Sequence, residues 1–282
     1  MFDFEVATPE VSIDQLAATE PAGAVLPATI DDLPAGYTYG VTRYADIILR
    51  HAFSKQFDDL MSALSQFTIH LQELRAGGGG RTVFVRRFDD SLAERGWGKK
   101  NIEIGKTIDG EVISAVRGHE IDMFSTGSKD KPYPGVAVEM EWNNKDPFYD
   151  RDLLNYQALH REGALAVGVI VTRGATLQRL LERTLLNDES RTSKYGKAST
   201  HWDKLLPRVG LGGGGECPLL LIGIEPARIE DRDVLIEADL MFDEADEFRA
   251  SWRNTYRSWS EAEPQWLALM KRGYDILDRS PH

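Results

Sequence analysis

Cysteine is nearly absent from this 282-residue chain, in which Cys217 is the only one. A single cysteine excludes an internal disulfide and a zinc cluster built on several thiolates. Apolar runs long enough to cross a bilayer are also absent, and the acidic N-terminus lacks the basic and then apolar order of a signal peptide. These absences favour a reducing, cytoplasmic location and no membrane partner.

Acidic residues outnumber basic residues at both ends of the chain. Residues 1–42 contain seven acids and no lysine or arginine, and residues 225–282 contain 14 acids and eight bases. Residues 1–42 therefore carry a net charge of −7 and residues 225–282 a net charge of −6. Since the whole chain carries −12, residues 43–224 carry +1. Residues 173–208 carry eight bases against four acids, and such a local field steers a charged partner more than the total charge does. The acidic total argues against tight non-specific binding of nucleic acid.

The apolar pattern predicts an α/β fold, in which a mixed β-sheet is flanked by helices. The expected helices cover residues 43–74, 147–162 and 175–186 and a tail from residue 237. The expected strands are 82–88, a hairpin over 101–124 with an Asp-Gly turn, 136–142, 164–172 and 218–226. The run 164–172 is β-branched almost throughout, which is typical of a central strand covered on both faces.

Several other features of the sequence predict flexible segments or packing surfaces. Residues 1–35 are rich in alanine, proline and acids, and we expect a loosely held arm. The glycine runs 76–81 and 210–216 lack the Lys-Ser/Thr of a phosphate loop and are expected to be flexible linkers. Tryptophans recur at residues 252, 259 and 266, a seven-residue spacing that predicts one helical face used for core or dimer packing.

Two carboxylates lie on one face of the expected strand 136–142. Side chains alternate along a strand, so the apolar residues point one way and Glu139 and Glu141 point the other. Unpaired buried carboxylates are costly, and this face must therefore meet water, a metal or a ligand. Asp122, on a candidate neighbouring strand, supplies a third acid.

Oxygen ligands of this kind suit Mg²⁺, which usually takes one or two carboxylates and keeps several waters. The expected ligands are Asp122, Glu139 and the backbone carbonyl of Met140. Glu141 would then orient or deprotonate a water beside the metal. Asp122, Glu139 and Glu141 are thus the candidate catalytic residues.

The acids and the residues around them resemble a known family. Asp122 followed by Glu139-Met140-Glu141 resembles the PD-(D/E)xK nuclease core in the variant that replaces the lysine. The run HEID…VAVEMEWNNKDPFYDRDLL is similar to type II restriction endonucleases of the BglII/BamHI type. The resemblance implies a restriction-endonuclease-like sheet of five or six strands and a homodimer on a palindromic site in double-stranded DNA. It also implies Mg²⁺-dependent cleavage that leaves 5′-phosphates, and residues 36–282 would form one endonuclease domain with a helical C-terminal extension.

Two segments are candidates for DNA contact. Asparagine can pair with adenine and lysine can bind phosphate or guanine, and the resemblance places base contacts just beyond the third catalytic position. The residues there are Asn143, Asn144 and Lys145. The segment 189–204 mixes hydroxyls and bases without apolar periodicity, which suits a loop that contacts bases and phosphates, although a solvated surface loop is the alternative. Its candidates are Ser193, Lys194, Lys197, Thr200, His201 and Lys204.

Three other functions compete with a site-specific restriction endonuclease. A phage-defence or repair nuclease of the same fold would lack fixed sequence specificity. A glycoside hydrolase could use Glu139 and Glu141 as acid and base, although the basic region 173–208 disfavours it. A DNA-binding protein without catalysis is disfavoured by the three acids.

Overall fold

Six strands form one mixed β-sheet at the centre of the structure, a computed structural model that describes residues 24–76, 81–185 and 195–279. The strands are β1 (Tyr37–Val41), β2 (Gly98–Ile108), β3 (Glu111–Ser125), β4 (Gly135–Glu141), β5 (Leu165–Arg173) and β6 (Leu219–Ile224). Their order in the sheet is β1-β6-β5-β4-β3-β2. Strands β4, β5 and β6 are parallel, and the other pairings are antiparallel. The predicted mixed sheet is confirmed.

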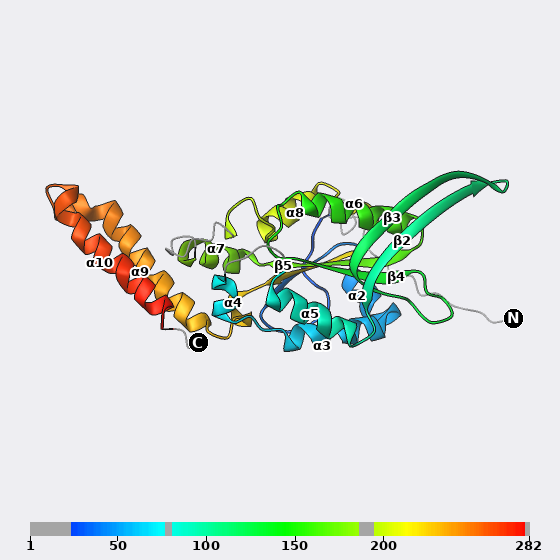
Figure 1. Ribbon diagram of the computed structural model, residues 1–282, viewed down its shortest axis with the longest axis horizontal. Coiled ribbons are helices and arrows are strands. Elements are labelled where there is room, and N and C mark those ends of the chain that lie inside the picture. The colour runs from blue at the N-terminus through cyan, green and yellow to red at the C-terminus, as the bar shows by residue number, and fades with distance from the viewer. Residues whose placement is uncertain (1–23, 77–80, 186–194, 280–282) are drawn as a thin grey trace, which may run out of the picture.

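Helices cover both faces of this sheet (Figure 1). On one face lie α2 (Ala45–Ala52), α3 (Ser54–Gln66), α4 (Leu71–Arg75) and α5 (Val83–Ala93), and on the other α6 (Phe148–Arg161) and α8 (Trp202–Gly210). The remaining elements are α7 (Ala175–Thr184), α9 (Arg232–Ser251), α10 (Trp259–Leu277) and the 3₁₀ turns η2 (Pro226–Arg228) and η3 (Trp252–Asn254).

The alternation of side chains along β4 and β5 divides the core into two layers. Val138 packs with α2, α3 and α5, whereas Ala137 packs with α6 and α8. Strand β5 is buried on both faces, as its β-branched run predicts. At Gly168 the Tyr156 ring lies against the strand backbone, and a Cβ there would stand 2.2 Å from Tyr156 Cδ2.

Strands β2 and β3 form the hairpin that the Asp-Gly turn predicts. Asp109 and Gly110 have φ values of 50° and 87°, and two consecutive positive φ angles are typical of a type I′ turn. The two strands continue as a narrow ribbon beyond the rest of the sheet (Figure 1). The base of β3, next to β4, carries the residues that reach the candidate site.

Two predictions of local structure are wrong. Residues 82–88, expected as a strand, lie mostly in α5, because Phe84, Phe88 and Leu92 share a helical face that is buried beside α3. The single helix expected over residues 43–74 is instead α2, α3 and α4. Phe53, with φ −131° and ψ 50°, separates α2 from α3 because this backbone conformation is not helical.

The glycine run 210–216, expected to be a flexible linker, forms hydrogen-bonded turns. Gly213 N donates to Arg208 O at 2.9 Å, and Cys217 N donates to Gly214 O at 3.0 Å. Residues 77–80 of the other glycine run and residues 1–23 of the expected arm lie outside the described residues.

A helical hairpin of α9 and α10 projects from the end of the molecule opposite to the β2–β3 ribbon (Figure 1). Arg183 of α7 anchors it through ion pairs with Asp239 at 3.0 Å and Asp243 at 2.6 Å. None of the helices in the described part of the chain is both long and apolar enough to span a membrane.

The three tryptophans of this hairpin contact one another in series. The ring centroids of Trp252 and Trp259 are 5.7 Å apart, and those of Trp259 and Trp266 are 5.9 Å apart. Trp252 belongs to η3 and not to α10. The stack therefore bridges the turn of the hairpin, and the single helical face expected from the spacing is wrong.

Candidate active site

The three predicted acids come together where β3 meets β4. Antiparallel pairing aligns Met123 with Val138 and so brings Asp122 level with Glu139. The backbone N–H of Asp122 donates to Glu139 Oε1 at 3.1 Å. Glu141 follows Glu139 on the same face of β4, since side chains two apart on a strand point the same way. The predicted neighbouring strand is therefore confirmed.

Glu141 is held at the end of β4 by polar contacts. Asn144 Nδ2 donates to Glu141 Oε2 at 2.7 Å. The Glu141 backbone carbonyl accepts a hydrogen bond from Thr172 Oγ1 at 2.8 Å, and that hydroxyl also contacts Tyr149 Oη at 2.6 Å. The end of β4 is thus joined to β5 and to α6. Met140, between the two glutamates, turns its side chain into the opposite core layer.

The acids line a cavity of about 420 Å³ between β3, β4 and α6. Glu139 and Glu141 are each 3% exposed, whereas the Asp122 side chain is 39% exposed. The lining residues are Glu120, Asp122, Glu139, Glu141, Asn144, Phe148, Arg151 and Asn155. The acidic face of β4 therefore opens into a polar cavity, as the alternation predicts.

A fourth carboxylate, Asp152 of α6, lies beside this cavity and was missed by the sequence analysis. It is 2% exposed, and it lies close enough to Glu141 for the two carboxyl groups to share a proton, although its Oδ2 meets no N–H or hydroxyl donor within the described residues. Asp152 shares the buried face of α6 with Tyr149 and Tyr156. An acid on the apolar face of an expected amphipathic helix is the signal that could have identified it.

Crowding and burial favour the neutral forms of these acids. Burial raises the pKa of Glu139 well above its ordinary range, and the Asp152 and Asp122 carboxylates raise it further. Burial and then Asp152 raise the pKa of Glu141 to about 8, although the Asn144 hydrogen bond opposes this. Burial also raises the pKa of Asp152. The ionised forms of these carboxyl groups would therefore need a compensating cation.

Two arginines supply part of that compensation. Arg151 of α6 lies 2.7 Å from Asp152 Oδ1 and 3.7 Å from Glu141 Oε1. Arg81 Nη2 lies 3.0 Å from Asp122 Oδ2 and 2.8 Å from Asp89 Oδ2. The Arg81–Asp89 contact is within ion-pair distance but is not aligned as a hydrogen bond.

The oxygen atoms of these acids are of the type that binds a hard divalent cation. Mg²⁺ prefers oxygen ligands and usually needs only one or two carboxylates. The crowding of Glu139, Glu141 and Asp152, which raises the pKa of all three, is consistent with such an ion. Among the described residues, no three His, Cys, Asp or Glu side chains converge as a metal site. The Asp122 carboxylate contacts Arg81 instead.

The two segments predicted to contact DNA lie side by side. Thr200 N donates to Asn144 O at 2.9 Å, Asp146 N donates to Ala198 O at 3.1 Å, and Lys145 forms an antiparallel bridge with Ser199. Residues 143–146 and 198–200 therefore form one small two-stranded surface next to the acids. The sequence analysis did not predict this pairing.

The individual DNA-contact candidates differ in exposure. The Lys197 side chain is 86% exposed and that of Lys204 is 38% exposed. Thr200 is 0% exposed and His201 is 6% exposed, so both lie beneath this surface. Ser193 and Lys194 lie outside the described residues.

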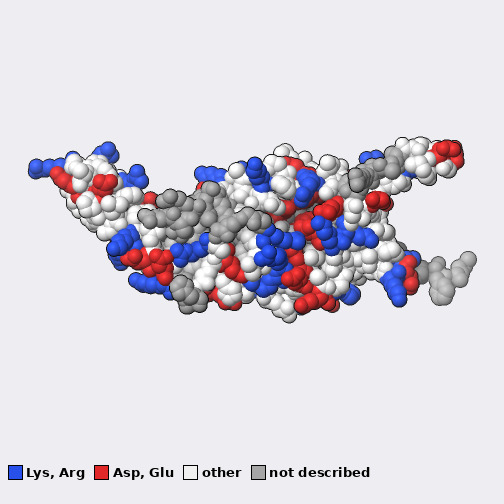
Figure 2. All heavy atoms as spheres, viewed as in Figure 1, with Lys and Arg blue, Asp and Glu red and all other residues white. Residues whose placement is uncertain are grey.

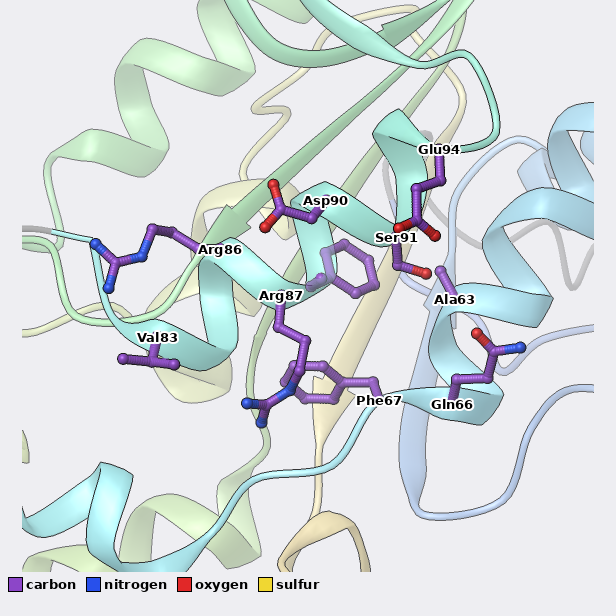
Figure 3. A pocket seen from close by; sticks show the side chains of 10 residues that line it. Ala63, Gln66, Phe67, Val83, Arg86, Arg87, Asp90, Ser91 and Glu94 are labelled. Carbon is purple, nitrogen blue, oxygen red and sulfur yellow. The ribbon is translucent and has the colours of Figure 1, made fainter.

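Neither the surface charge nor a second cavity points to another site. Figure 2 shows acidic and basic side chains intermixed over one face, without a large patch of one sign. Figure 3 shows a cavity of about 500 Å³ between α3 and α5, lined by residues such as Gln66 and Arg87. Arg87 is bound there by Glu73 at 2.8 Å, and none of the candidate catalytic residues lines this cavity.

Comparison with protein families decides the identity of the fold and the class of the enzyme. The family described as restriction endonuclease BglII/BglIII matches residues 37–224. The chain belongs to this family. It is therefore a type II restriction endonuclease, a site-specific deoxyribonuclease whose substrate is DNA.

The family match covers the whole β-sheet and the candidate site, from the start of β1 to the end of β6. It favours the restriction endonuclease over the unspecific nuclease and the glycoside hydrolase. Helices α9 and α10 follow the matched segment. A search among curated proteins found no match to this chain.

Proposed function

We propose that this restriction endonuclease is Mg²⁺-dependent and hydrolyses the phosphodiester bonds of double-stranded DNA to leave 5′-phosphates. Asp122, Glu139 and Glu141 would be its catalytic residues. The observation that supports this most directly is the meeting of all three acids in one polar cavity, with Asp122 N bonded to the Glu139 carboxylate. Carboxylates that would repel one another without a cation are suited to bind one.

Each acid has a separate role in this proposal. Asp122 and Glu139, with the backbone carbonyl of Met140, would hold the ion. Bound Mg²⁺ would polarise a phosphoryl oxygen and lower the pKa of a water molecule. Glu141 would orient that water and accept its proton. The Asn144 hydrogen bond restrains the Glu141 carboxylate, and a preorganised base needs less rearrangement during the reaction.

The DNA would lie along the edge of the sheet where β4 ends. Lys145 is exposed there to contact phosphates or bases, with Lys197 and Lys204 on the adjoining segment, and Asn143 is half-buried with its Oδ1 enclosed, so that it would contact a base after turning its amide outward. Ser193 and Lys194 remain proposed contacts on the composition of their segment alone. Thr200 and His201 would act from beneath the surface, because both are buried.

A homodimer would complete the enzyme. A palindromic site presents the same contacts in two orientations, and a two-fold dimer matches this symmetry. Sedimentation of the protein with and without DNA would test it. A monomer that cuts both strands at the same rate would contradict the proposed dimer.

The decisive experiment compares Glu139→Gln with Glu120→Gln. Both residues line the cavity, but Glu120 is 63% exposed and paired with Lys99 at 2.8 Å, which makes it a matched control. Loss of Glu139 should lower the cleavage rate by about 100-fold or more, since an electrostatic contact to the transition state is removed. DNA binding should persist, and the Glu120 variant should cut normally.

The measurements are cleavage of a mixed-sequence plasmid with Mg²⁺ or with EDTA, sequencing of the ends, and gel-shift binding without metal. Discrete fragments with 5′-phosphates that require Mg²⁺ are expected. Full cleavage by the Glu139 variant, or equal cleavage in EDTA, would remove the proposed mechanism.

A further inference from the structure

Arg173 is a buried cation next to the candidate site that has no role in the mechanism above. Its side chain is 0% exposed, and its guanidinium lies 5.6 Å from the Trp142 ring centroid and 5.1 Å from that of Tyr195. Burial lowers the pKa of Arg173 to about 10, so the group stays charged at neutral pH. A buried charge is costly unless it is well hydrogen-bonded, and such residues usually specify a local arrangement.

The hydrogen bonds of Arg173 all go to one short segment. Its Nε and Nη2 donate to Thr200 O at 3.2 and 2.7 Å, and Nη2 also donates to Ser199 Oγ at 2.6 Å. Nη1 is buried and has no hydrogen-bond partner within the described residues. The planar fork of arginine can reach two acceptors at fixed angles, which a lysine cannot do.

The segment that Arg173 holds is one half of the two-stranded surface described above. Its other half is residues 143–145, joined to it through the bonds Thr200 N to Asn144 O and Asp146 N to Ala198 O. Any shift of residues 198–200 would therefore be passed to residues 143–145. Base readout through bidentate hydrogen bonds tolerates only small displacements.

We propose that Arg173 is a positioning residue for sequence recognition, which fixes residues 198–200 and through them the base-contacting segment 143–145. This inference rests on the proposed function, because it requires residues 143–145 to contact bases. Arg173 itself does not touch DNA.

The test compares Arg173→Lys with Arg228→Lys in the full-length protein. Arg228 is a matched control, since its Nε donates to Phe67 O at 2.9 Å and its guanidinium lies 5.3 Å from the Tyr37 ring. It has the same kind of partners but none in the proposed DNA surface. Because Arg228 is less buried than Arg173, the unfolding midpoint of each variant is measured beside the readouts below.

Two readouts separate positioning from stability. The first is hydrogen exchange of the Thr200 and Asp146 amides, which should become about tenfold faster in Arg173→Lys and stay unchanged in Arg228→Lys. The second is the ratio of cleavage rates on two duplexes, one with the site found by sequencing plasmid ends and one with a single base pair changed. This ratio should fall about tenfold in Arg173→Lys, the loss expected for one base contact, and should not change in Arg228→Lys.

Asn143→Ala distinguishes failure of this inference from failure of the proposed function. If Asn143→Ala lowers the discrimination between the two duplexes but Arg173→Lys does not, the positioning role of Arg173 is wrong. The proposed base contacts of segment 143–145 then stand. If Asn143→Ala leaves discrimination unchanged, the proposed base contacts are wrong, and the inference falls with them.

Ser199→Ala covers the case in which Arg173→Lys does not fold. It removes the bond from Arg173 Nη2 to Ser199 Oγ, together with the bond that Ser199 Oγ donates to Gly196 O within the same segment, and should lower discrimination by about threefold or more. Unchanged discrimination in Ser199→Ala, together with unchanged amide exchange at Thr200, would overturn the proposal.

Discussion

Asp89 provides a sharp test of the electrostatics around the site. Its side chain, on α5, is only 5% exposed, and its ion-pair partner Arg81 is shared with Asp122. Burial raises the pKa of Asp89 from 3.8 to about 7, even though Arg81 opposes the shift. Replacing Asp89 with asparagine keeps the shape of the side chain and removes its ionisation.

The sign of the expected effect follows from the raised pKa of Asp89. Between pH 3.8 and about 7 the folded state binds more protons at this carboxyl than the unfolded state does. Stability therefore falls as pH rises through this window, and the full cost is present above it. At pH 8 the cost is at most about 4 kcal/mol, and at pH 5 it is under about 2 kcal/mol. Asp89→Asn should remove this cost.

The assay is a thermal melt of both proteins in EDTA at pH 5 and pH 8. For a protein of this size about 1 kcal/mol corresponds to about 2 °C. The advantage of Asp89→Asn over the parent should thus grow by about 5 °C between the two pH values. Asp90→Asn, at the exposed neighbouring position on α5, is the control and should show much less growth, because the Asp90 carboxylate contributes least to the raised pKa of Asp89. Parallel pH profiles of Asp89→Asn and the parent would refute the reasoning.

Two further predictions concern the packing that supports the site. Gly168→Ala should lower the unfolding free energy by about 3 kcal/mol, because the added Cβ would stand 2.2 Å from Tyr156 Cδ2. Gly105→Ala is the control and should cost much less, because a Cβ at Gly105 would meet no atom within 4 Å. Equal midpoints in urea would contradict this. Tyr149→Phe should cost about 1 to 2 kcal/mol, because it removes the buried contact with Thr172 Oγ1 at 2.6 Å. An unchanged urea midpoint would show that this contact adds nothing.

The acid cluster could be predicted because its geometry is encoded locally. Alternation along β4 sets the face of Glu139 and Glu141 without reference to the rest of the chain. Only the pairing of β4 with the strand that carries Asp122 could not be read from local sequence. The β3–β4 register confirms that pairing. The same alternation predicts that Met140 turns into the opposite core layer.

The prediction of a strand at residues 82–88 is wrong because seven residues are too few to distinguish the period of a strand from that of a helix. Val83, Phe84 and Val85 favour a strand by composition. The positions that decide for a helix are Phe88 and Leu92, which complete one buried face with Phe84. Short apolar runs remain ambiguous until their tertiary partners are known.

Asp152, Arg81 and Arg151 could not be assigned to the site from spacing, because they reach it from separate elements. Asp152 and Arg151 are neighbours on α6, yet one is buried and the other lines the cavity. Arg81 lies outside any regular element and contacts Asp122 across 41 positions of the sequence. Such contacts depend on how helices dock on the sheet, which residue periodicity does not specify.

The arrangement of the strands brings the proposed recognition segment and the proposed catalytic acids to one end of the sheet. Strand β4 pairs antiparallel with β3 and parallel with β5, so the base of β3 and the carboxyl ends of β4 and β5 meet at one place. The parallel register sets Glu141 opposite Thr172, and Arg173 follows at once on β5. A displacement of the surface that Arg173 holds would therefore reach Asn144, and through its amide the Glu141 carboxylate. A mismatched base pair would thus disturb Glu141, the proposed general base, as well as the binding of DNA.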